Sequence, residues 1–493
     1  MEINYAQTPP AEQPKIPASD AVFAWVSPVL GFVFTHFAVK YFGGVWGGII
    51  WSLFGIMGTV FVKVKAINVK PAHAVVFGIA EIFCFTPIFS ASRLINFLAA
   101  FFSFILYLYL TTAISGAELF GRHFVSDLLQ SVFVRPFANF ARQPKSVCSV
   151  FRERSCSRKI LYALLGLLIA LPLTIVVVLL LMSSDELFAN SMRGFTEHLP
   201  RLSPSLVREI AFAIPIAMYL FGTIFSMQND ATTHSEAAPG YRVFPPTVSY
   251  FAVSPICVFY FVYIVTQFFN IANAIEKTLD YSAFARRGFF ELCAIAVINL
   301  AVIAFIQTFT KRNEYDIKPL VLRVYTVVIS LFTLLIIATA ITKMLMYIDE
   351  YGMTLLRVYT SWFMLLLALI FVLIIALQFR DYVIWKAIFA VFTVMFAILC
   401  FGNFEGAVAR YNISAYQAGK LSELDISEFD ELGFPAVKPA AELLESGSLS
   451  DNEAKQVQRF LKSEKIADED TDKFAYFSIP RASARSAIKR LDI

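Results

Sequence analysis

Long apolar runs alternate with short polar stretches along most of the chain. A helix that crosses a bilayer needs about 20 mostly apolar residues. About eleven segments meet this requirement: 21–37, 42–62, 72–90, 94–115, 160–182, 208–227, 249–269, 288–309, 319–342, 358–378 and 382–401. The runs are continuous and do not alternate residue by residue, which excludes the pattern of a β-barrel. We therefore predict an all-α polytopic membrane protein with about eleven transmembrane helices.

Polar stretches mark both ends of this region. Residues 1–20 are rich in proline and lack a basic segment followed by an apolar core, so we expect a disordered leader and no cleavable signal peptide. Residues 21–402 form the predicted transmembrane domain. Residues 403–493 are predicted to form a small soluble helical tail, in which Ser450 and Glu453 have the spacing of a capping box at a helix start.

The composition supports a membrane protein and argues against a metal site. The chain is 58% hydrophobic and 16% charged, whereas soluble proteins have about 25% charged residues. The six cysteines and five histidines show no metal-ligand spacing. We expect no metal, no cofactor and no nucleic-acid partner.

The distribution of Lys and Arg predicts the orientation. These residues are concentrated in the loops after even-numbered segments, which the positive-inside rule places in the cytoplasm. The N-terminus is then cytoplasmic and the tail extracytoplasmic, where it offers a surface for an envelope protein partner. Most of the bias comes from loop 116–159, whose basic residues are Arg122, Arg135, Arg142, Lys145, Arg152, Arg154, Arg158 and Lys159.

The same loop has the pattern of an interfacial helix. Phe124, Leu128, Val132 and Phe133 recur at helical spacing between the basic residues. Such a segment lies in the membrane interface and attracts anionic lipid headgroups, which are the partner that we expect for it. The alternative is a cytoplasmic elbow that only fixes the topology.

Three polar, aromatic stretches interrupt the apolar pattern, at 281–292, 341–364 and 403–425. The predicted topology puts the charged parts of all three on the extracytoplasmic side. We expect a cluster beneath the tail made of Arg287, Glu291, Lys343, Tyr347, Asp349, Arg357, Arg410 and Asn412. This cluster is either a binding site for a charged ligand or lipid headgroup, or a set of helix-end contacts that attach the tail. Within the stretch 341–364, Gly352 predicts the end of one helix and Thr354 predicts the N-cap of the next.

Polar residues inside the predicted spans form a second set. Glu81 lies in the middle of a span, where a carboxyl group is a functional candidate by default and suits a proton-carrying site. Alternatively it is protonated and hydrogen-bonded between helices. Asn299 and Gln307 are expected to hold helices together.

The polar stretches also carry a family resemblance. Residues 281–292 are similar to the segment Tyr-Ser-x-Tyr-Ala-Arg-x-Gly-Phe-Phe-Glu-Leu, with Phe284 in place of the second Tyr. Residues 344–357 resemble Met-x-x-Tyr-Ile-x-x-Tyr-Gly-x-Thr-x-x-Arg, and 411–416 resemble Tyr-Asn-x-x-x-Tyr. These segments resemble the family called domain of unknown function 4173, which is related to domain of unknown function 4153. The resemblance implies a bacterial inner-membrane protein and names no catalytic residue.

Three functions fit these features. The first is a non-catalytic accessory, scaffold or sensor in the cell envelope. The second is a secondary transporter, which requires a polar cavity near Glu81 or Asn299. The third is an enzyme acting on a lipid-linked substrate at the outer surface, with Glu291 or Lys343 as the reactive group.

Overall fold

The computed structural model describes residues 18–38, 44–64, 69–149, parts of 174–190, 204–229, 244–274, 289–311, 320–380, 382–421, 423–469 and 476–491. Over these ranges the protein is helical, apart from one isolated bridge between Phe244 and Thr310. Ten stretches in the described ranges are long and apolar enough to cross a membrane, which confirms the predicted fold class. The remaining predicted span, 160–182, lies largely outside the described residues, as does the predicted leader.

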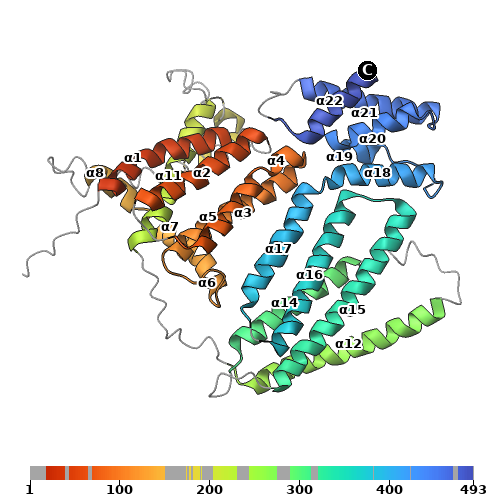
Figure 1. Cartoon of the computed structure of the whole chain (residues 1–493), viewed down its shortest axis with the longest axis horizontal. Helices are drawn as coiled ribbons and strands as arrows, with labels where there is room; N and C mark the ends of the chain where they lie inside the picture. Colours follow the sequence, from red (N-terminus) through yellow and green to blue (C-terminus); the bar gives the residue numbers. More distant parts are fainter. Residues whose placement is uncertain are drawn as a thin grey trace, which may run out of the picture.

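The helices form two lobes and a tail (Figure 1). The first lobe holds α1 (Ala18–Val33), η1 (Phe34–Ala38), α2 (Val45–Val64), α3 (Pro71–Cys84), α4 (Thr86–Phe89), α5 (Arg93–Ile114), α6 (Phe124–Leu129), η2 (Gln130–Val134), α7 (Arg135–Ala138), α8 (Arg142–Ser149) and α11 (Pro204–Asn229). The second lobe holds α12 (Pro246–Ala274), α14 (Phe289–Phe309), α15 (Leu320–Tyr351), α16 (Leu355–Phe379) and α17 (Ile384–Phe401). The tail holds α18 (Phe404–Gln417), α19 (Ser427–Leu432), α20 (Phe434–Glu445), α21 (Asp451–Glu469) and α22 (Ile479–Arg490).

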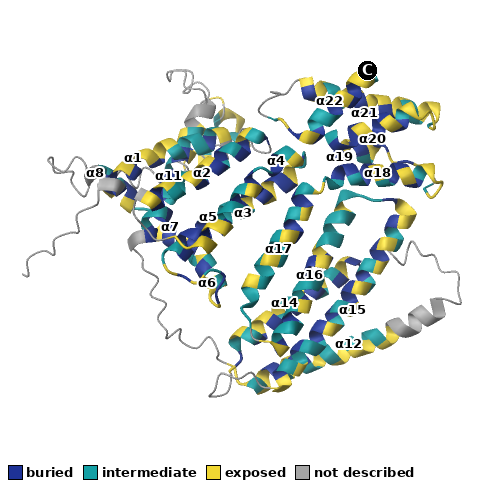
Figure 2. Ribbon diagram, viewed as in Figure 1, coloured by how far each residue is buried: buried dark blue, intermediate teal, exposed yellow. Residues whose placement is uncertain are grey.

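Exposed positions lie along the helices of both lobes (Figure 2), and many of them are large apolar residues, as expected for helices that face lipid. Exposed examples from four different helices are Leu53, Phe101, Phe259 and Leu335. Glycines instead mark close contacts between helices. A Cβ added to Gly48 of α2 would lie 2.3 Å from the carbonyl oxygen of Cys84 in α3. Such a close approach of two helix backbones is typical of small residues at helix contacts in membranes.

A proline divides the third predicted span into α3 and α4. Pro87 has no N–H to donate to the carbonyl oxygen of Phe83, four residues earlier. The Thr86 hydroxyl donates to that oxygen instead, at 2.8 Å. The chain therefore changes direction at Phe85 and leaves no unpaired carbonyl at this position.

A row of aromatic contacts joins α17 to the first lobe along its whole length. We call this row the aromatic seam. Its ring pairs are Trp385 with Phe124, Phe389 with Phe120, Phe392 with Phe102, Phe396 with Phe83 and Phe401 with Phe89, and their centroids lie 3.9 to 5.4 Å apart. Aromatic pairs at such distances add to the stability that burial provides. At one end of the seam, Lys386 also pairs with Glu118 at 2.9 Å.

The tail has its own apolar core, which includes Val437, Val457, Phe460 and Leu461. The predicted capping box is confirmed: α21 begins at Asp451, and Ser450 and Glu453 bond to each other through backbone and side chain. Met353, Leu355 and Val358, at the turn between α15 and α16, pack against the same core. The tail therefore rests on the second lobe through apolar contacts.

Loop 116–159 differs from its predicted amphipathic pattern. Phe124 and Leu128 pack against the core around Tyr109 and do not face outward. Phe133 is 60% exposed, and it shares the outer surface with Val125, Leu129, Val134 and Phe137. The π-helical turn η2 interrupts the α-helical repeat here, and this changes which residues share a face. Arg135 is buried and donates to the Ser115 hydroxyl at 3.2 Å, so it is not a surface charge.

Candidate binding pocket

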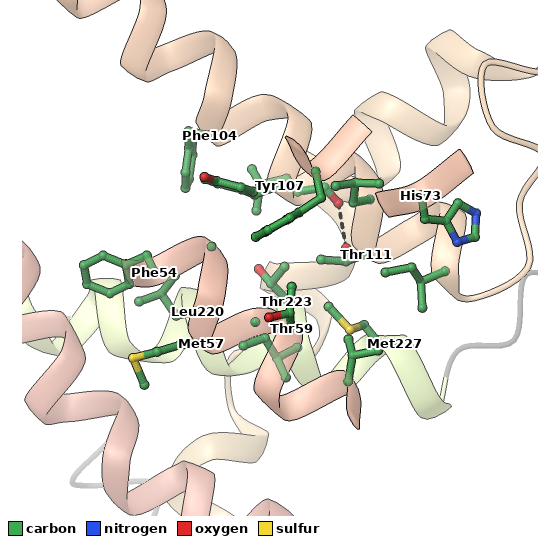
Figure 3. Close-up of a pocket in the computed structure, with 18 of the residues that line it drawn as sticks. Phe54, Met57, Thr59, His73, Phe104, Tyr107, Thr111, Leu220, Thr223 and Met227 are labelled. Atoms are coloured by element: carbon green, nitrogen blue, oxygen red, sulfur yellow. Dashed lines mark hydrogen bonds between the residues drawn. The ribbon is translucent and has the colours of Figure 1, made fainter. Parts of the chain in front are cut away.

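A pocket of about 290 Å³ lies inside the first lobe, between α2, α3, α5 and α11. In Figure 3, Phe54 and Phe104 lie at one end of it, and His73 and Met227 lie at the other. Gly58 of α2 helps to create this space, because a Cβ added there would meet nothing within 4 Å. The sequence does not predict the pocket, since a glycine inside an apolar helix equally fits close helix packing.

Most of the residues that line the pocket are apolar. Its three threonine hydroxyls all donate to carbonyl oxygens of their own helices. Thr59 donates to Ile56 at 2.7 Å, Thr111 to Leu108 at 2.6 Å and Thr223 to Tyr219 at 2.8 Å. A hydroxyl that is satisfied within its helix does not require a polar ligand. The pocket therefore suits an apolar molecule.

Glu81, the predicted intramembrane carboxylate, lies beside the pocket and does not line it. It accepts hydrogen bonds from the Ser52 hydroxyl and, at 2.9 Å, from the Tyr107 hydroxyl, and Tyr107 forms part of the pocket wall. Cys84 lies 3.3 Å from the same hydroxyl. Gly55 makes room for this group, because a Cβ there would lie 2.6 Å from Glu81 and 2.5 Å from Tyr107. Hydrogen bonding between helices, one of the two expectations for Glu81, is the arrangement found.

Two basic residues stand at one end of the pocket. Lys63 lies in the last turn of α2, and His73 lies in the first turn of α3. Both line the pocket, and the described lining residues include no Asp or Glu. His73 is only 5% exposed, and its Nδ1 has no hydrogen-bond partner among the described residues. Neither residue was among the predicted site residues, because isolated bases at helix ends usually mark only the membrane surface.

Part of the predicted polar cluster meets at the turn between α15 and α16. Asn412 of α18 accepts from the Met353 N–H at 2.7 Å and donates to the Met353 carbonyl oxygen at 2.8 Å. Arg357 donates to the carbonyl oxygens of Tyr351 and Gly352 and lies over the Tyr347 ring, 4.3 Å from its centroid. The predicted helix stop and N-cap are confirmed, since Gly352 has φ +76° and Thr354 caps α16.

The other predicted residues lie in different surroundings. Lys343 is buried in α15 and interacts electrostatically with Glu291 of α14. Asp349 and Arg410 are exposed, and Arg287 lies outside the described residues. The contacts at this turn resemble the attachment of a tail more than a ligand pocket, because Asn412 and Arg357 bond to backbone groups.

Glu428 of α19 joins this junction and was not predicted. It is half-buried beside Leu355 and Arg357 at the start of α16. Glu405, at the start of α18, is 4% exposed and lies 3.5 Å from the Ser90 hydroxyl of the first lobe. Burial raises the pKa of both carboxyl groups. Two acidic groups with raised pKa values therefore lie where the tail meets the lobes.

Polar residues inside the second lobe are satisfied by one another. Asn299 accepts from the Tyr260 hydroxyl at 2.5 Å and donates to the Thr333 hydroxyl at 2.8 Å. Gln307 donates to the Thr326 hydroxyl at 3.3 Å. These bonds link α12, α14 and α15, which is the role in helix packing that was expected for both residues. Within the described ranges, no group of three His, Cys, Asp or Glu residues has the arrangement of a metal site.

Comparison with known proteins gives one family. The sequence model described as Domain of unknown function (DUF4153) matches residues 77–443. The motifs at 281–292 and 344–357 had suggested domain of unknown function 4173, and this expectation is corrected to the related family that matches. No curated protein and no solved structure matches the chain.

Proposed function

The chain belongs to the family described as Domain of unknown function (DUF4153), and we propose that it is a non-catalytic accessory or sensor that holds an apolar molecule in its first lobe. The pocket of about 290 Å³ is the observation that carries this proposal. Its size is close to the lower end of known ligand pockets, about 300–1,000 Å³. Its three threonine hydroxyls are satisfied within their helices, so none of them requires a polar group on the occupant.

The two other functions have less support. A secondary transporter needs a polar site near the middle of the membrane, but Glu81 and Asn299 are both engaged by hydroxyl groups of neighbouring helices. An enzyme acting on lipid-linked substrates needs a reactive group facing a groove, whereas Lys343 is buried and interacts with Glu291. Binding without chemistry is the function that requires the fewest additional features.

The proposal includes a location. The protein lies in the bacterial inner membrane, with a cytoplasmic N-terminus and an extracytoplasmic tail. The Lys/Arg bias of loop 116–159 and the family resemblance support this placement. The outward-facing residues Leu129, Phe133 and Phe137 suit contact with the lipid interface, where the surrounding basic residues attract anionic headgroups. The tail is the surface that we assign to an envelope partner.

Filling the pocket tests the function. Gly58→Leu places a side chain in the pocket, whereas Gly78→Leu adds the same group at a helical glycine that is also open but does not line it. Each protein is placed in nanodiscs of neutral phospholipid and labelled with a diazirine derivative of hexadecanol, and the modified peptides are identified by mass spectrometry. We expect pocket peptides of α2, α5 and α11 to be labelled in the wild type and in Gly78→Leu, and not in Gly58→Leu. Equal labelling of these peptides in all three proteins contradicts the proposal.

A further inference from the structure

We infer that the occupant of the pocket is a long-chain fatty acid whose carboxylate lies between Lys63 and His73. This inference rests on the proposed function and adds the chemical class of the ligand. It depends on three features of the pocket: its length, the two bases at one end, and its small volume.

The pocket is long and has one end at the level of the helix termini. Its lining residues on α2 extend from Trp51 to Lys63, which at 1.5 Å per residue corresponds to about 18 Å. The hydrocarbon core of a bilayer is about 30 Å thick. The pocket is therefore about as deep as one leaflet. A straight chain with its head at the membrane surface matches this shape.

The end at the helix termini favours an anionic head. Lys63 is exposed and lies in the last turn of α2, and a lysine side chain can place its ammonium group at the interface while its stem contacts apolar surface. His73 lies in the first turn of α3, where the helix dipole also favours negative charge. Its buried Nδ1 has no partner among the described residues. Without an acid in the described lining to neutralise these bases, a carboxylate is the complementary group.

The volume favours one chain over two. A pocket of about 290 Å³ is at the low end of ligand sites. A phospholipid would have to leave its second chain outside this space. A single-chain acid places its whole hydrophobic part inside the pocket and its only charge at the basic end.

Palmitic acid and hexadecanol test the inference because they differ in the head and share the chain length. Each competes, unlabelled, against the diazirine derivative of hexadecanol in the nanodisc assay. We expect palmitate to compete about tenfold better than hexadecanol in the wild type, since hydrogen bonds to charged groups are stronger than those to neutral groups. The double variant Lys63→Gln, His73→Phe should lose this preference and keep its labelling by the hexadecanol derivative. Lys311→Gln, an exposed lysine of the second lobe, is the control and should keep the preference.

Other results of this competition experiment would contradict the inference or the proposed function. Equal competition by the acid and the alcohol in the wild type overturns the inference and leaves the proposed function in place. A preference that survives in the double variant also overturns it. Stronger competition by dipalmitoyl phosphatidylglycerol than by palmitate assigns the site to a two-chain lipid and overturns the fatty acid. Absence of labelled pocket peptides in the wild type removes the proposed function itself.

Discussion

At the scale of single residues, Asn412 connects the tail to the second lobe through both polar atoms of its side-chain amide. It pairs with the N–H and the carbonyl oxygen of Met353, which lie in the turn that follows Gly352. A side chain at Gly352 would meet Asn412 at 2.9 Å, in a backbone conformation that favours glycine. The backbone conformation at Gly352 and the position of the Asn412 side chain therefore depend on each other.

We predict that Asn412→Ala weakens this attachment by about 1–3 kcal/mol, because both backbone groups of Met353 lose their partner. The effect is measured as a lower midpoint of thermal unfolding in nanodiscs and as faster hydrogen exchange in α18. Ser414→Ala, on the exposed side of the same helix, serves as the control. Equal behaviour of the two variants would show that the amide does not hold the tail.

Some residue roles follow from local sequence and others do not. Thr354 and Ser450 were predicted as caps because their partners lie three residues away. Asn412 appeared in the predicted cluster, but its partner Met353 is 59 residues distant and bonds through its backbone. A backbone partner leaves no signature in the amino-acid sequence, so only the structure identifies it.

At the scale of elements, the junction between α18, α19 and the two lobes contains the buried Glu405 and the half-buried Glu428. Burial raises the pKa of each group in the folded protein; Glu431 and Asp425 add to the effect at Glu428, while Leu355 and Arg357 oppose it. A carboxyl group with a raised pKa holds its proton more tightly in the folded state. Its contribution to stability is complete below the unfolded pKa and is lost as the pH rises through the folded pKa.

We therefore predict that the tail attaches more firmly in mildly acidic than in mildly alkaline solution. Hydrogen exchange in α18 should become faster as the pH rises, after correction for the intrinsic exchange rate. Glu405→Gln keeps the contact with Ser90 without a titrating proton and should reduce this dependence, whereas Glu423→Gln, an exposed change in the same tail, should leave it unchanged. A pH dependence that is the same in Glu405→Gln and the wild type would contradict this assignment.

The helix end at Gly352 was predicted because the sequence interrupts the helix directly there. The division of span 72–90 at Pro87 was not predicted. The interfacial loop was predicted less well. Phe124 and Leu128 share a face of α6, as the spacing predicts, but that face packs against the core around Tyr109. The π-helical turn η2 breaks the helical repeat only after Leu129, so it affects the residues that follow.

At the scale of the whole molecule, the tail follows one end of α17 (Figure 1), and Lys386, which pairs with Glu118, lies in the first turn at the other end. On the proposed orientation, Lys386 is cytoplasmic and the tail that follows Phe401 is extracytoplasmic.

Reporter fusions test this orientation. Alkaline phosphatase fused after Ile493 should be active, since it folds outside the cytoplasm, and green fluorescent protein at the same position should be dark. A fusion after Lys311, in a loop expected to be cytoplasmic, should show the reverse pattern. Fluorescence from the Ile493 fusion would invert the proposed topology.

The ten predicted spans that lie in the described ranges matched because each is a continuous apolar run, and its length identifies such a run as long enough to span a membrane. The pocket could not be predicted in the same way. It depends on how four helices leave space around Gly58, and that arrangement is set by contacts between residues far apart in the chain.

The aromatic seam has a mechanical consequence. Aromatic pairs join α17 to the first lobe from Trp385 to Phe401. Separating α17 from this lobe would therefore expose a row of large ring surfaces at once. We expect α17 to stay with the first lobe in any rearrangement of the second lobe, although its sequence is continuous with the second lobe.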